Sequence, residues 1–198
     1  MYQKEIWSEA YARIYSNKGA ITRGVNENTL DGFSSERVEN IISKLTENKY
    51  KFTSARRTYI TKRSSNKKRP LGIPTGDDKL VQEVARILLQ RIYEPIFSDE
   101  SHGFRPQRSG HTAIRQIHKQ WTGIKWFAEF DIRGFFDNME HSLLVELLEK
   151  KIDDKRFIKL IKCMLKAGYL EDFHYHPTYS GTPQGPSCAQ AKGLEAEN

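Results

Sequence analysis

The segment 126–138 contains residues whose types and order suit metal-dependent chemistry. A largely apolar run, 126–130, leads into Asp131, and a glycine follows three residues later. Mg²⁺ prefers oxygen ligands in octahedral geometry and is commonly held by one or two carboxylates together with substrate phosphates. The pattern therefore predicts a strand that delivers Asp131 to a Mg²⁺ site. The alternative interpretation is an ordinary strand end, with Phe135 and Phe136 as core residues.

A second group of residues suits phosphate binding. Nine bases and no acid lie between positions 49 and 69, and aromatic and apolar residues are interleaved with them. The alternation predicts two strands joined by a turn at 64–67. A surface of one sign that also carries aromatic groups favours nucleic acid, whereas a merely soluble surface usually mixes both signs. The bases are Lys49, Lys51, Arg56, Arg57, Lys62, Arg63, Lys67, Lys68 and Arg69.

Several helices are expected around these segments. Apolar residues at helical spacing predict a helix through 38–45, capped by Ser34 or Ser35, and a long helix from Thr75 to near Pro95. Further helices are predicted at about 110–121, through 143–148, and through 157–165 with closure by Gly168, followed by a hairpin at 169–180. Helices mixed with a few antiparallel strands predict an α+β fold.

Composition limits the remaining possibilities. The chain has 198 residues, enough for one large or two small domains, and a formal net charge of +7. No apolar run approaches the ~20 residues of a membrane helix, and the first ten residues lack a signal-peptide pattern. With only Cys163 and Cys188 present, a reducing compartment is expected, and Cys163 is predicted to be a small core residue. His174 and His176 form a conceivable metal pair without a third ligand nearby.

Four motifs occur in order and together carry a family resemblance. They are RPLGIP at 69–74 with DKLVQ at 78–82, SHGFRP at 101–106 with Arg108-Ser109, the Asp131 segment, and TPQG at 182–185. The series, over about residues 24–185, resembles the reverse transcriptases encoded by group II introns. The resemblance implies a right-hand polymerase, of which this chain supplies the fingers and an incomplete palm, with antiparallel strands packed against several helices.

The resemblance also implies a division of the chain. Residues 1–90 are expected to form an N-terminal extension and the fingers, and 91–185 a partial palm that returns into the fingers within about 139–182. The segment 186–198 departs from the family pattern and is expected to be a disordered or non-native tail, produced by a frameshift, a cloning scar or a natural truncation. The family's second catalytic motif, Tyr-x-Asp-Asp, would follow 182–185 and does not occur in the chain.

By the same resemblance, individual residues acquire expected roles. Asp131 is the catalytic carboxylate and one of three carboxylates of a two-metal Mg²⁺ site, which the backbone carbonyl of Ile132 also faces. Asp137 matches the family pattern, but a cap of the following helix is favoured for it. The expected nucleotide-binding residues are Lys62 and Arg69 on the triphosphate, the N–H groups of Gly134 and Phe135, Phe136 as the steric gate against a 2′-hydroxyl, and Gln184.

Two functions are compatible with this resemblance. The first is an RNA-directed DNA polymerase that copies intron RNA for retrohoming and binds that RNA as a maturase, with RNA template, DNA primer and dNTP as partners. The second is a non-catalytic RNA-binding module, the fragment alone lacking polymerase activity. A homodimer is possible, no membrane partner is expected, and the location is bacterial or organellar cytoplasm. The expected RNA-binding residues are Lys49, Lys51, Arg56, Arg57, Arg63, Lys67 and Lys68.

Overall fold

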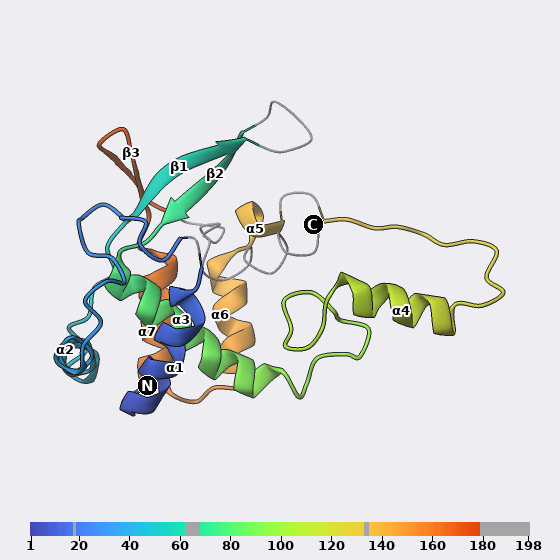
Figure 1. Cartoon of the computed structure of the whole chain (residues 1–198), viewed down its shortest axis with the longest axis horizontal. Helices are drawn as coiled ribbons and strands as arrows, with labels where there is room; N and C mark the ends of the chain where they lie inside the picture. The colour runs from blue at the N-terminus through green and yellow to red at the C-terminus, as the bar shows by residue number, and fades with distance from the viewer. Residues whose placement is uncertain (18, 62–67, 133–134, 179–198) are drawn as a thin grey trace.

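The computed structural model of the chain describes residues 1–17, 19–61, 68–132 and 135–178, with only the backbone of Phe136 and Asp137. In this part, helices lie beneath one small sheet, and the C-terminal hairpin joins that sheet (Figure 1). The predicted α+β class is confirmed. None of the described helices combines the length and apolarity that a membrane crossing requires.

The sheet has the strand order β2-β1-β3-β4. Strand β1 (Ala55–Thr61) is antiparallel to β2 (Lys68–Ile73), and β3 (Tyr169–Glu171) is antiparallel to β4 (His174–His176). Both predicted hairpins are therefore present. They are joined by a parallel pairing of β1 with β3, which was not predicted. A parallel pair needs a long crossover, and here the intervening helices provide it.

Gly168 makes the approach of the second hairpin possible. Its φ is +69°, and an added Cβ would lie 2.5 Å from the carbonyl oxygen of His176. Its own carbonyl accepts a 3.1 Å hydrogen bond from the N–H of Ala55, at the start of β1. Gly168 therefore connects the end of the helical region to the sheet in a conformation that other residues rarely adopt.

The main core forms where α1 (Lys4–Tyr15) and α2 (Ser35–Thr46) pack on α3 (Gly76–Tyr93). Trp7 from α1 and Leu80 from α3 are fully buried in it. The capping predictions for α2 and α3 are confirmed, since the side chains of Ser34 and Thr75 accept hydrogen bonds from the third residue of each helix. Helix α1 was not predicted. Its buried residues nevertheless follow a helical face: Ile6, Trp7, Ala10 and Ile14.

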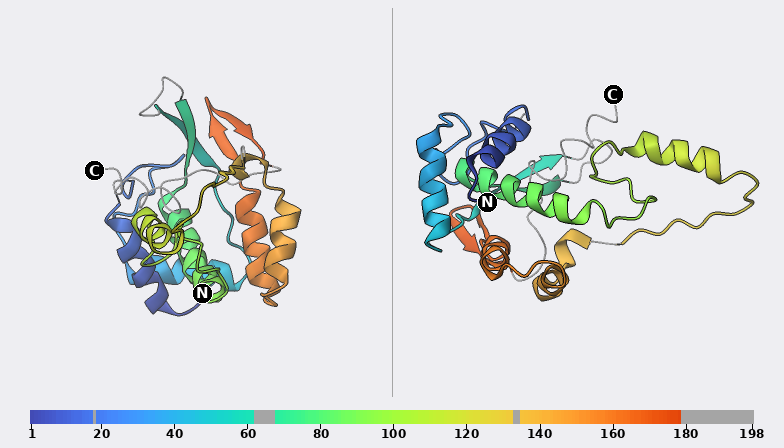
Figure 2. Two further views of the ribbon diagram at one scale, coloured as in Figure 1. Left: turned by 90° about the vertical axis from the view of Figure 1, so that its right-hand side faces the viewer. Right: turned by 90° about the horizontal axis from the view of Figure 1, so that it is seen from below.

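A second cluster joins α6 (His141–Glu149) and α7 (Lys155–Leu165) to the far side of α3, and the two helices run side by side (Figure 2). Asp154 caps α7 by accepting from the N–H groups of Arg156 and Phe157. The prediction that Cys163 is a core residue is wrong, because its side chain is exposed. The face of α7 that packs inward contains Phe157, Ile158, Ile161 and Leu165, and Cys163 falls outside that spacing.

Helix α4 (Gly110–Gln120) and the segment after it project away from the other elements (Figure 1). No residue of α4 is buried. Residues 122–132 form no strand, and Trp126 and Phe130 are each 91% exposed, so the strand predicted before Asp131 is wrong for this chain. The physical reason is the absence of a neighbour: among the described residues no strand pairs with this segment, and an unpaired strand leaves its backbone groups unsatisfied.

We expect Lys79 of α3 to give the fold a measurable pH dependence. The side chain is 2% exposed, and its Nζ donates to the carbonyls of Gly19 and Thr22 at 3.0 and 2.6 Å. Burial, with a smaller contribution from Arg56, lowers the pKa of Lys79 to about 8. Because this value lies below that of the unfolded chain, folding releases a proton between about pH 8 and 10.5, and the free energy of unfolding rises with pH in that window.

Urea unfolding at several pH values tests this prediction against the variant Lys79→Met. Relative to the variant, the free energy of unfolding of the native chain should rise by roughly 2–3 kcal/mol between about pH 8 and 10.5. Parallel pH profiles of the two proteins would contradict it.

Candidate nucleotide and nucleic-acid interface

The register of the β1–β2 hairpin separates its cationic side chains between two faces of the sheet. Arg57 pairs with Gly72 and Lys68 with Thr61, whereas Arg56 pairs with Ile73 and Arg69 with Ile60. Side chains alternate along a strand, and directly paired residues share a face. Arg57 and Lys68 therefore lie on one face, and Arg56 and Arg69 lie on the other.

Some of the predicted RNA-binding residues form hydrogen bonds or ion pairs within the protein, and others do not. Arg56 donates to the carbonyls of Arg23 and Gly24 and so fastens an internal loop. Lys49 forms a 2.7 Å ion pair with Glu47. Within the described ranges, Arg57, Lys68 and Arg69 form no ion pair, and the buried Nε atoms of Arg57 and Arg69 have no hydrogen-bond partner. Among the described residues these three cations, together with the exposed Lys51, are available to an outside anion.

The remaining predictions for this segment lie outside the described residues. They concern Lys62 as a triphosphate ligand, and Arg63 and Lys67 as RNA-binding residues. Lys51 is exposed in the irregular segment before β1. Their roles stay predictions.

A buried carboxylate fixes the base of the hairpin. Asp78, 1% exposed, accepts hydrogen bonds from the Tyr50 hydroxyl at 2.8 Å, the Thr53 N–H at 3.1 Å and the Thr75 hydroxyl at 2.8 Å. Burial raises the pKa of Asp78, while these donors oppose the shift. Burial also raises the pKa of Tyr50, and the neighbouring Asp78 adds to the effect. Apart from the capping pattern around Thr75, no local pattern in the sequence indicates this contact.

Asp131 and Ile132 lie in the exposed irregular segment rather than at the end of a paired strand. Among the described side chains, no group of three or more His, Cys, Asp or Glu is placed to hold a metal ion. A two-metal Mg²⁺ site needs more carboxylate oxygens than Asp131 alone supplies. The described residues therefore do not form such a site by themselves.

The other predicted residues around Asp131 are only partly described. Phe135 begins the short helix α5 (Phe135–Asn138) and is 45% exposed, and the backbone of Phe136 continues that helix. Gly134 and Gln184 lie outside the described residues. The N-cap position of α6 is Glu140, and because the side chain of Asp137 lies outside the described part of the structure, its capping role stays a prediction.

The SHGFRP motif stabilises the segment that connects α3 to α4. Arg105 is 6% exposed, and it binds the carboxylate of Glu94 at 2.9 Å and the carbonyls of Ser98 and Ser101 at 2.6 and 2.9 Å. His102 contacts Thr112 and Gln116 of α4 through its two ring nitrogens. Arg105 and His102 of the SHGFRP motif therefore make internal contacts in this structure.

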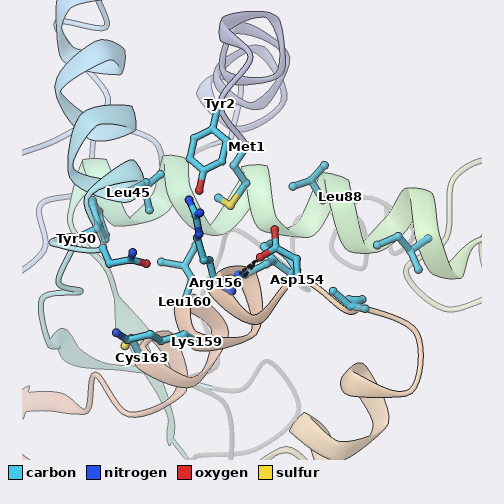
Figure 3. A pocket seen from close by; sticks show the side chains of 14 residues that line it. Met1, Tyr2, Leu45, Tyr50, Leu88, Asp154, Arg156, Lys159, Leu160 and Cys163 are labelled. Atoms are coloured by element: carbon cyan, nitrogen blue, oxygen red, sulfur yellow. Dashed lines mark hydrogen bonds between the residues drawn. The ribbon is translucent and has the colours of Figure 1, made fainter.

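A pocket of about 300 Å³ lies apart from the predicted site residues, although Tyr50 lines it. It opens between the start of the chain, the end of α2, the C-terminal part of α3 and the helix α7 (Figure 3). Its floor is apolar, with Leu45, Leu88 and Leu160, and its rim carries Asp154 and Arg156. None of the predicted site residues lines it.

Residues 60–191 match the family described as reverse transcriptase (RNA-dependent DNA polymerase). That range is more than half of the chain and includes the free cations of β2 as well as Asp131. The chain belongs to this family. The predicted resemblance is therefore confirmed at the level of the reverse transcriptase family and of intron-encoded relatives.

The relatives that share this reverse transcriptase sequence are much longer than this chain. The "Group II intron-encoded protein LtrA" of Lactococcus lactis subsp. cremoris is 52% identical over 93% of this chain and 31% of its own length. The "Uncharacterized 91 kDa protein in cob intron" of Schizosaccharomyces pombe is 45% identical over 93% of this chain and 23% of its own length. The "Nuclear intron maturase 1, mitochondrial" of Arabidopsis thaliana is 36% identical over 47% of this chain and 13% of its own length. The chain therefore spans about a third or less of these relatives.

The contacts of Arg105 predict a stability role for the SHGFRP motif. Arg105→Ala removes a buried cation and leaves Glu94 and two carbonyls without their donor, which should lower the free energy of unfolding by about 3 kcal/mol. Arg108→Ala is the matched control, because Arg108 pairs with Asp99, whose side chain is 86% exposed. That exposed pair should contribute less than about 1 kcal/mol. Urea unfolding of both variants measures the difference, and equal effects would show that the contacts of Arg105 do not support the fold.

Proposed function

We propose that this chain is the fingers and first palm portion of a group II intron-encoded reverse transcriptase, an RNA-directed DNA polymerase that copies intron RNA for retrohoming and also binds that RNA as a maturase. The observation that carries the proposal is the 52% identity to an intron-encoded protein over 93% of the chain. Residues 1–90 correspond to the N-terminal extension and fingers, and 91–185 to a partial palm. The working location is the cytoplasm of a bacterium or the interior of an organelle.

The nucleotide contacts are proposed on the Arg69 face of the hairpin. Arg69 has a buried Nε without a hydrogen-bond partner and forms no ion pair among the described residues. A guanidinium offers a planar fork of donors that matches phosphate oxygens, and a nearby lysine adds a mobile point charge. Arg69 with Lys62 is therefore the proposed grip on the dNTP triphosphate, and Gly134, Phe135, Phe136 and Gln184 complete the proposed pocket.

Asp131 is proposed as one carboxylate ligand of catalytic Mg²⁺. When bound, the metal pair neutralises the charge that develops during phosphoryl transfer. Because the described residues do not complete a metal site, the other carboxylates must come from elsewhere in a longer polymerase. We therefore expect the 198 residues alone to bind RNA without extending a primer, and primer extension by this chain is the test.

A non-catalytic RNA-binding module is the second candidate function. The described hairpin favours it through three cations, Arg57, Lys68 and Arg69, that no described acid neutralises. Intron RNA, and RNA template paired with DNA primer, are the proposed partners. A homodimer remains a proposal, and sedimentation of the chain with and without RNA would test it.

RNA binding by the hairpin should depend strongly on salt. If about four of its cations contact phosphates, the logarithm of affinity should fall with the logarithm of salt concentration at a slope of about −3 to −4. Reversing Lys67, Lys68 and Arg69 to Glu should weaken binding by about tenfold or more, because contacts are lost and repulsion is added.

The control for this prediction reverses three exposed bases of α7, Lys155, Arg156 and Lys159, to Glu. This change alters the net charge by the same amount on α7, a helix that is not part of the hairpin. A filter-binding or fluorescence titration compares the two variants. A salt-independent affinity, or an equal loss in both variants, would argue against the hairpin as the RNA-binding surface.

Phe136 should control the choice of sugar in a longer polymerase that contains this segment. An aromatic ring beneath the sugar leaves no room for a 2′-hydroxyl, so Phe136→Ala should increase ribonucleotide incorporation on the order of tenfold while deoxynucleotide use persists. Single-nucleotide incorporation with dNTP and rNTP measures the ratio. If the variant loses both activities and its thermal unfolding transition, Phe136 is a core residue and the gate lies elsewhere.

A further inference from the structure

Three flat side chains form a continuous row across the sheet. The guanidinium of Arg57 lies 3.6 Å above the ring centroid of Tyr169, and the Tyr169 ring stacks on His176 with centroids 4.9 Å apart and an interplanar angle of 14°. The residues come from β1, β3 and β4, so the row crosses from the centre of the sheet to its edge strand. We name this row the Arg57–Tyr169–His176 stack.

The face that carries the stack is open to solvent. On this face the register places Tyr59 two residues from Arg57, Lys68 farther along the hairpin opposite Thr61, and Glu171 and His174 beside Tyr169 and His176. Tyr59 is 52% exposed, and Lys68, His174 and His176 are exposed as well. The opposite face contains the buried side chains of Leu71 and Ile73. The stack is therefore on the outer face of the sheet.

Charge on this face favours an anion. Arg57 forms no ion pair among the described residues, and Glu171 already accepts a hydrogen bond from the Tyr59 hydroxyl. The Nε of Arg57 is buried, and the terminal N–H groups of its guanidinium are the donors that match phosphate oxygens. At the other end of the row, the exposed His176 ring presents an aromatic surface at the open edge of the sheet.

We propose that the Arg57–Tyr169–His176 stack binds unpaired nucleotides of RNA, with a base stacked on His176, one backbone phosphate contacted by Arg57, and another, farther along the hairpin, contacted by Lys68. The inference rests on the proposed RNA-binding function and specifies the surface and the form of RNA. Single-stranded RNA is recognised by stacking of splayed bases on aromatic and guanidinium planes, whereas the bases of a duplex stack on each other. Lys68 extends the row of positive charge along β2 on the same face.

The register makes this site separable from the proposed nucleotide site. Arg69 lies on the opposite face from Arg57, so an RNA strand on the stack and a triphosphate on Arg69 contact different sides of one hairpin. Substitutions at His176 should therefore change RNA affinity without changing nucleotide affinity.

The test uses the 198-residue chain and a short single-stranded RNA that carries one 2-aminopurine, whose fluorescence falls when the base stacks. The variants are His176→Ala, which removes the ring, and His176→Phe, which restores a flat ring without the imidazole nitrogens. The matched control is Tyr175→Ala, because Tyr175 is a 55% exposed ring of the same strand on the opposite face. Arg57→Lys keeps the charge and loses the planar stack.

The proposal expects quenching with the native chain and about fivefold or greater loss of affinity in His176→Ala, with recovery in His176→Phe and no change in Tyr175→Ala. Binding without quenching, equal affinity for a fully paired duplex, or unchanged affinity in both His176→Ala and Arg57→Lys would overturn it. If the native chain still binds RNA in a salt-dependent manner in those cases, the proposed RNA-binding function is retained. Absence of any salt-dependent RNA binding would reject that function, and this inference with it.

Discussion

The buried start of α3 is the constraint on which the cationic hairpin depends. Asp78 accepts from the N–H of Thr53, which lies just before β1, and from the hydroxyl of Thr75, which lies just after β2. Both ends of the hairpin are therefore tied to one carboxylate. The next residue, Lys79, binds two carbonyls of the loop that precedes α2. A carboxylate and a lysine this deeply buried are tolerated because each has several hydrogen-bond partners.

A neighbouring contact extends this arrangement to α2. Arg37 donates to the carboxylate of Asp77 at 2.7 Å, to the amide oxygen of Asn28 at 2.8 Å and to the carbonyl of Thr29 at 2.7 Å. The base of the hairpin is thus held by charge-assisted hydrogen bonds, while Arg57, Lys68 and Arg69 form no ion pair with the described residues. This division explains how one hairpin can be rigid at its base and still present Arg57, Lys68 and Arg69 to phosphates.

The sequence predicted the elements that have strong local signals. The period of Val38, Ile41 and Leu45 and the caps at Ser34 and Thr75 placed α2 and α3 correctly, because helix faces and caps are local properties. The alternation of bases with aromatic residues likewise placed the β1–β2 hairpin. Helix α1 was overlooked although its inward face has helical spacing. The parallel pairing of β1 with β3 had no local signal, since it joins residues far apart in the chain.

The predictions around Asp131 depended on partners that a local pattern does not contain. The apolar residues from Trp126 to Phe130 have strand propensity, yet a strand forms only where another strand satisfies its backbone groups. In the described structure Trp126, Phe127 and Phe130 are exposed, and among the described side chains Asp131 belongs to no group of three or more possible metal ligands. The family motif marks Asp131 as a candidate metal ligand, and that role stays a prediction.

The most direct measurement of the central claim is primer extension on an RNA template by a longer polymerase that contains this segment, compared with its Asp131→Ala and Asp131→Asn variants. The account predicts that both variants lose extension by several orders of magnitude, because a metal carboxylate is removed, while RNA affinity stays unchanged. Extension at the native rate by either variant would contradict the assignment of Asp131 as a catalytic ligand.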